Sequence, residues 1–159
     1  MAVHYRKDDA TYYERKKVGN QTIELGINWL EDSDDERHSW WNVYITVFNK
    51  KKDMYKNMDK KAITGENPLK NVLVAREMFY DVEAYLLDRE LVHGCYDDVT
   101  ILCTWVNNRR RDAYYRVLSK MGYEWGTYYH EKCIKKTYNI DDVNPAIMWW
   151  KEVEENDNF

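Results

Sequence analysis

The sequence has no apolar run that approaches the ~20 residues needed to span a bilayer, and its N-terminal residues include no apolar segment typical of a signal peptide. Its three cysteines, Cys95, Cys103 and Cys133, are an odd number without CxxC spacing. This pattern excludes the disulfide framework of a small secreted domain and the ligand spacing of a zinc site. These absences favour a cytoplasmic protein with reduced thiols.

Residue clusters that hold metals or activate nucleophiles are missing as well. The 4 histidines share no spacing typical of a zinc site or a catalytic triad. The acidic segment from Glu31 to Glu36, followed by His38, lacks the glycine and the ordered spacing of a calcium loop. We interpret it as a solvated loop, and we predict neither a metal nor a catalytic residue.

The composition is that of a globular protein with many large aromatic side chains. The 159 residues are 44% hydrophobic and 33% charged, which fits one domain spanning residues 1–159. The formal net charge of −4 argues against general nucleic-acid binding. The 7 tryptophans and 14 tyrosines greatly outnumber the 3 phenylalanines. The amphipathic rings of tryptophan and tyrosine suit half-exposed sheets, grooves and interfaces.

The first third of the chain predicts three antiparallel strands. The segment Thr11–Val18 is followed by a Gly19-Asn20 turn signal and by residues 22–30, where apolar and polar residues alternate. A third alternating segment covers residues 40–48. We therefore expect an antiparallel meander with one buried face.

Both prolines follow an asparagine, which is the pattern of a helix start. Asn67-Pro68 precedes apolar residues at spacings of three and four, so we expect a helix that ends near residues 88–89. Asn144-Pro145 has the same start signal and predicts a C-terminal helix at about residues 144–155. Its Trp149 and Trp150 either cover the sheet or form a docking surface.

The remaining segments complete an α+β pattern. Residues 99–106 are nearly all apolar and predict a central strand, residues 109–121 predict a helix that stops at Gly122, and residues 125–129 and 132–138 predict a closing hairpin. Because a helix connects residues 40–48 with the central strand, we expect these two strands to be parallel, within a mixed sheet.

This order of elements, together with NNRRRDAYYRVLSKMGY after the central strand, resembles the GNAT superfamily of acetyl-CoA-dependent N-acetyltransferases. Lys120-Met121-Gly122-Tyr123 looks like the Gly-aromatic end of a family helix, and Asn107 or Asn108 like the family's asparagine near the strand exit. The resemblance implies a GNAT-like mixed sheet. It also implies that backbone groups near Gly65 hold the cofactor pyrophosphate, and that an acceptor amine enters beside splayed strands, with Glu24 or a nearby acid as base.

The sequence departs from the family at its chemistry. The family's first strand and two early helices have no counterpart, and the two glycines of its pyrophosphate turn fall on Pro68, which has no N–H, and Lys70. The position of the family's tyrosine acid is Leu118; Tyr114 or Tyr115 could replace it only if the helix were rotated or shifted. We therefore predict weak or no acetyl-CoA binding.

Two functions follow from this resemblance. The first is a non-catalytic binding or inhibitor protein without a cofactor, similar to the compact acidic proteins of phages and other mobile elements, whose partner is a protein or an anionic small molecule. The alternative is an N-acyltransferase that uses acetyl-CoA and an unknown amine acceptor.

Three consecutive arginines, Arg109, Arg110 and Arg111, stand at the predicted helix start, where each cation costs roughly 0.3–1 kcal/mol before screening. They form either an ordinary surface paired with nearby aspartates or a site for an anion or an acidic partner. In the second interpretation Arg109 and Arg110 point outward, Arg111 lies nearer the sheet edge, and glutamine at all three positions stabilises the fold but abolishes binding.

The segment from Gly65 to Lys70 is either a plain helix cap or an anion site. The candidate binding residues are Arg109, Arg110, Arg111, Asn108, Gly65, Lys70, Trp149 and Trp150.

Overall fold

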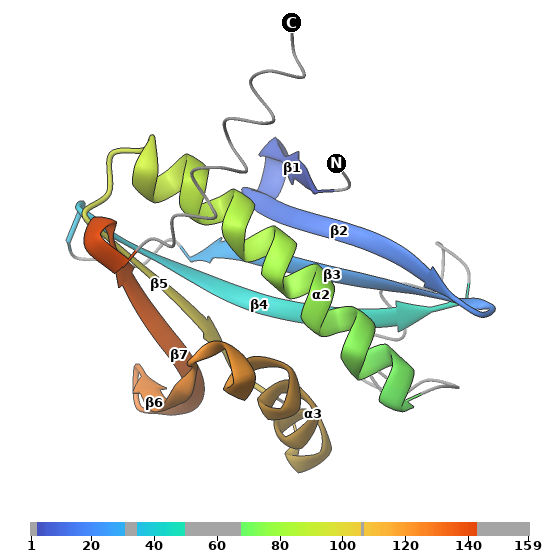
Figure 1. Ribbon diagram of the computed structural model, residues 1–159. Coiled ribbons are helices and arrows are strands. Elements are labelled where there is room, and N and C mark those ends of the chain that lie inside the picture. The colour runs from blue at the N-terminus through green and yellow to red at the C-terminus, as the bar shows by residue number, and fades with distance from the viewer. Residues whose placement is uncertain (1–2, 31–34, 50–67, 106, 143–159) are drawn as a thin grey trace, which may run out of the picture.

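The computed structural model describes residues 3–30, 35–49, 68–105 and 107–142, and these form an α+β fold with one seven-stranded mixed sheet (Figure 1). The strand order is β1-β2-β3-β4-β5-β7-β6. The predicted mixed α+β class is therefore confirmed. The predicted sites at Gly65, Trp149 and Trp150, the Asn67 cap and the C-terminal helix at 144–155 lie outside the described residues.

The meander consists of β2 (Thr11–Val18), β3 (Gln21–Leu30) and β4 (His38–Phe48), all paired antiparallel. A short strand, β1 (His4–Arg6), precedes the meander in the chain and pairs with β2. The expectation that no strand precedes residue 11 is therefore wrong. Three residues are too few to show a hydrophobic period, so only the pairing with β2 defines this strand.

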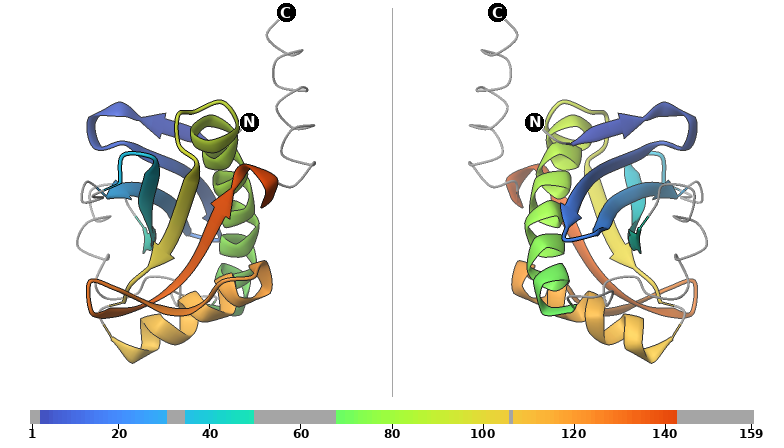
Figure 2. Two further views of the ribbon diagram at one scale, coloured as in Figure 1. Left: turned by 90° about the vertical axis from the view of Figure 1, so that its left-hand side faces the viewer. Right: turned by 90° about the vertical axis from the view of Figure 1, so that its right-hand side faces the viewer.

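One long helix, α2 (Pro68–Leu87), connects the meander to β5 (Asp98–Cys103), which pairs parallel with β4 as expected. Proline is its first helical residue, and a π-helical turn, Asp88–Val92, extends its end. Figure 2 shows α2 against one face of the curved sheet. The described members of the predicted apolar stripe are buried: Val72, Ala75, Phe79, Val82 and Leu86.

The chain after β5 forms a shorter helix and a hairpin. The helix α3 (Asn108–Leu118) is capped by the Asn107 side chain, which accepts a hydrogen bond from the backbone N–H of Arg110 at 2.9 Å. Strand β5 ends at Cys103, its last residue paired with β7, and so stops before the predicted residue 106. Gly122 takes a left-handed conformation with φ 85° and ends the helical segment as predicted.

The hairpin consists of β6 (Glu124–Tyr128) and β7 (Glu131–Asn139). Strand β7 pairs with β5, and β6 is the last described strand at this side of the sheet. No helix in the described part of the chain is long and apolar enough to cross a membrane.

Candidate functional site

Pairing between the two parallel strands stops one residue before the end of β5, while β4 continues to Phe48, and we call this point the β4–β5 separation. Strands β4 and β5 pair over residues 38–42 and 98–102, and beyond Asn42 no further pairing between them is present in the described residues. The Cys103 Sγ lies 3.6 Å from the Val43 carbonyl oxygen, to which it donates a hydrogen bond. A side-chain hydrogen bond therefore joins the two strands directly after their last backbone pair.

Two side chains of α3, Arg110 and Tyr114, are buried where the pairing between β4 and β5 stops. The backbone of Ile45 in β4 hydrogen-bonds Tyr114, and Arg110 Nη1 donates to the Tyr114 hydroxyl at 3.3 Å. Burial, together with the proximity of the Cys103 thiol, raises the pKa of Tyr114 to about 12. Burial also raises the pKa of Cys103. The thiol and the phenol therefore stay neutral near pH 7, and both are buried as core groups.

The position of Arg110 corrects one prediction. Its side chain is only 8% exposed, so the expectation that it points outward is wrong, whereas Arg109 is exposed as expected. Residues four apart share one helix face, and Arg110 precedes the buried Tyr114 by four. Packing of that face against the sheet therefore buries Arg110 as well.

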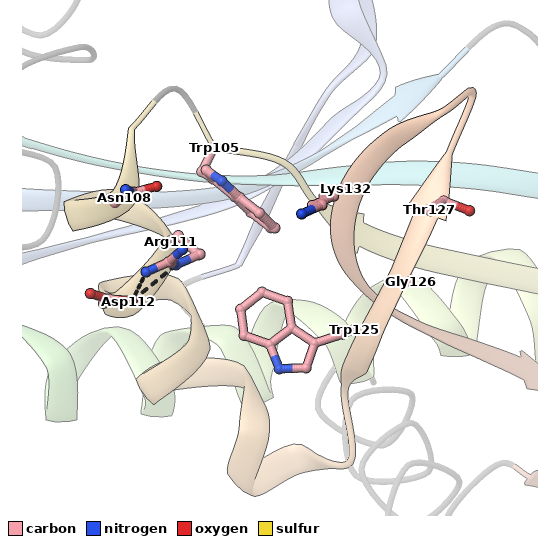
Figure 3. Close-up of a pocket in the computed structure, with 8 residues that line it drawn as sticks. All are labelled: Trp105, Asn108, Arg111, Asp112, Trp125, Gly126, Thr127 and Lys132. Carbon is pink, nitrogen blue, oxygen red and sulfur yellow. Dashed lines mark hydrogen bonds and ion pairs between the residues drawn. The ribbon is translucent and has the colours of Figure 1, made fainter.

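A solvent-open hollow of about 750 Å³ lies between the start of α3 and the β6–β7 hairpin (Figure 3). Trp105 extends into it from the loop after β5, and Trp125 from β6, with ring centroids 5.6 Å apart at 89°. Trp125 is 52% exposed and stacks on Tyr115 at 4.9 Å. Among the described residues, the lining consists of Trp105, Asn108, Arg111, Asp112, Trp125, Gly126, Thr127 and Lys132.

The hollow carries two cations and one carboxylate. Arg111 forms an ion pair with Asp112 at 3.0 Å, and Lys132 extends from β7 on the other side (Figure 3). Arg111 and Asn108 therefore line the hollow on the α3 side, across from the edge strand β6 (Figure 3). Two cations beside the exposed Trp125 ring and the partly buried Trp105 ring can hold a negatively charged group together with an apolar one.

The hairpin wall includes a lysine that crosses from β7 to β6. Lys135 Nζ donates to the Thr127 carbonyl oxygen at 3.1 Å. A Cβ at Gly126 would lie 2.6 Å from Lys135 Cε, so glycine leaves the space through which this side chain passes. Lys135 therefore covers part of the β6 backbone at the edge of the sheet.

A buried carboxyl group joins the hairpin and the end of the α3 segment to α2. Glu83 Oε2 accepts hydrogen bonds from the hydroxyls of Tyr123 at 2.7 Å and Tyr138 at 2.8 Å. Burial raises the pKa of Glu83, although both tyrosine hydrogen bonds and the nearby Lys136 oppose this rise. This cluster supports the hairpin from the core side.

Several sequence-derived candidates lie outside the hollow. Glu24 is buried, with one oxygen accepting from Arg15 Nε at 2.6 Å and the other from the Tyr44 hydroxyl at 2.9 Å, and it does not line the hollow. Lys70 is exposed in the first turn of α2 and does not line the hollow. Leu118 is buried.

Sequence reasoning missed Trp105, Trp125 and Lys132, because they come from three separate segments and share no motif. One signal was available. In the predicted hairpin, residues 125 and 127 share one face of the sheet, because side chains along a strand alternate between its two faces. Comparison of the chain with family models, with curated proteins and with solved structures yields no match. The site is therefore interpreted from its own geometry.

Proposed function

We propose that this chain is a non-catalytic binding protein with a GNAT-like fold. Support comes from the order of elements: a meander, a helix, a strand parallel to the last meander strand, a second helix and a closing hairpin. The resemblance described from the sequence has the same order. This shared order of elements supports the GNAT-like fold.

The observation that carries the proposal is the filled separation between β4 and β5. In the GNAT superfamily, which the sequence resembles, an acceptor amine enters beside splayed strands. In this chain Arg110 and Tyr114 of α3 are buried with Cys103 at the corresponding place. A ligand in this place would have to displace a buried arginine and a buried tyrosine. The first helical residue of α2 is Pro68, which has no N–H for a pyrophosphate, and this also supports the proposal.

The hollow is the contact site of the proposed binding protein. Tryptophan, tyrosine and arginine are the residue types that contribute most to protein interfaces, and Trp125, Tyr115 and Arg111 lie together beside it. Its two cations favour an anionic partner group, which agrees with an inhibitor or binding protein that acts on an acidic surface.

Isothermal titration calorimetry with acetyl-CoA tests this function against the alternative, an acetyl-CoA-dependent N-acyltransferase. We expect no saturable heat at millimolar cofactor, because the space beside the strands is occupied. A Tyr114→Phe variant is the matched control, since it keeps the ring in place and removes only the hydroxyl. Micromolar binding that free CoA competes away would refute the proposal and restore the enzyme.

A further inference from the structure

The turn between β6 and β7 has a backbone conformation that its residues rarely adopt. Tyr129 has φ 47° and His130 has φ 68°, between the paired residues Tyr128 and Glu131. Two consecutive positive φ values describe a type I′ turn, for which Asn-Gly is strongly preferred. A tyrosine in the left-handed region is sterically unfavourable, because its Cβ crowds the backbone. Such strain at a surface turn points to a role for the side chains.

The side chains of this turn extend the aromatic surface of the hairpin. The Tyr129 side chain is 66% exposed, and its ring lies edge-on to Tyr128 at 4.7 Å. Tyr128 in turn lies 5.6 Å from the Trp40 ring of β4. The strained turn therefore holds Tyr129 outward at the end of the hairpin whose other face borders the hollow.

The two faces of the hairpin differ in charge. Lys132 is on the face that borders the hollow, whereas two carboxylates and one cation, Glu124, Glu131 and Lys135, are on the opposite face by strand alternation. A bound segment is therefore matched in charge if it directs acidic side chains toward the hollow and neutral ones toward the opposite face.

The outer edge of β6 pairs with no other strand among the described residues. Edge strands accept extended peptides through backbone hydrogen bonds, and alternate peptide side chains then fall on one face of the sheet. At this edge the Lys135 side chain covers the Thr127 carbonyl oxygen with one hydrogen bond, which an incoming strand can replace. Displaced, it remains available to pair with an acidic group.

We propose that β6 and its turn bind an extended, acidic segment of a partner protein as an added strand. Its acidic side chains enter the hollow between Arg111 and Lys132, and Tyr129 and His130 contact the part of the segment that passes the turn. This inference rests on the proposed binding function and names the class of partner.

The test uses the full chain and a fluorescein-labelled ten-residue peptide of alternating glutamate and valine, measured by fluorescence anisotropy at low salt. A peptide with glutamine in place of glutamate is the charge control. A peptide N-methylated at alternate residues is the control for strand pairing, since it cannot complete the backbone hydrogen bonds. We expect the acidic peptide to bind at least tenfold more tightly than either control.

Two protein variants separate this inference from the proposed function. The double variant Arg111→Gln, Lys132→Gln should weaken peptide binding at least tenfold. The turn variant Tyr129→Asn, His130→Gly should raise the melting temperature, because it relieves the left-handed tyrosine, and should weaken binding at least fivefold.

Each remaining outcome overturns the inference. If the turn variant is more stable and binds the peptide unchanged, the strained turn has no binding role, while the hollow keeps its proposed function. Equal binding of the N-methylated peptide excludes an added strand. If the acidic peptide does not bind but inorganic phosphate or a single-stranded oligonucleotide does, the site binds a different class of anion. Acetyl-CoA titration tests the binding function separately from all of these.

Discussion

Arg110 and Arg111 are adjacent in sequence, yet they belong to two different regions of the molecule. Arg110 is buried with Tyr114 where β4 and β5 separate, whereas Arg111 lines the open hollow with Asp112. Both cations stand in the first turn of α3, where the helix dipole opposes positive charge. One helical turn therefore contributes both to a closed region, which supports the fold, and to an open hollow.

Truncation of neighbouring tyrosines gives the largest expected contrast between the regions. Tyr114→Ala removes a buried ring and should lower the free energy of unfolding by about 3–5 kcal/mol, as other large aromatic truncations in cores do. Tyr115→Ala removes an exposed ring that stacks on Trp125, and should cost about 0.5–1.5 kcal/mol. Urea denaturation measures both values. Equal losses would show that the β4–β5 separation is not closed by Tyr114.

The two arginines themselves give a smaller contrast. Arg110→Gln should lower the free energy of unfolding by about 1–2 kcal/mol, because the loss of a buried charged hydrogen bond exceeds the relief at the helix start. Arg111→Gln should change it by less than about 0.5 kcal/mol. The stabilisation expected for glutamine at all three arginines therefore applies only to Arg109 and Arg111. Chemical denaturation of the single variants decides this, and an Arg110→Gln variant as stable as Arg111→Gln would contradict it.

The pH dependence of stability reports on the closed side. Burial raises the folded-state pKa of Glu83 above its value in the unfolded chain, about 4.3. Between these two pKa values the folded protein binds more protons than the unfolded chain, so Glu83 makes stability fall as pH rises through this interval.

Glu83→Gln should therefore flatten the decline in the urea midpoint from about pH 4.5 toward neutral pH. The glutamine oxygen can still accept from Tyr123 and Tyr138, so the loss of titration is separated from the loss of these hydrogen bonds. Exposed Glu77→Gln is the matched control on the same helix. Parallel pH profiles for the original chain and Glu83→Gln would disprove the role of this carboxyl group.

Local signals predicted the elements well where they depend on nearby residues. The strand Thr11–Val18, the proline start of α2 and the Gly122 stop are all confirmed at the expected positions. A signal for Arg110 was also present, since it precedes the inward-facing Tyr114 by one helical turn. In contrast, the three-residue β1 has no periodicity of its own and exists through pairing with β2.

The sequence by itself determined the order of elements from Thr11 onward, the apolar stripe of α2 and the helix ends, because capping and periodicity act over a few neighbouring residues. Only the tertiary structure decided that β4 and β5 separate around Arg110 and that Trp105, Trp125 and Lys132 meet beside Arg111. These contacts join segments that are distant along the chain. Their positions follow from how the helix and the hairpin pack on the sheet, which no local pattern contains.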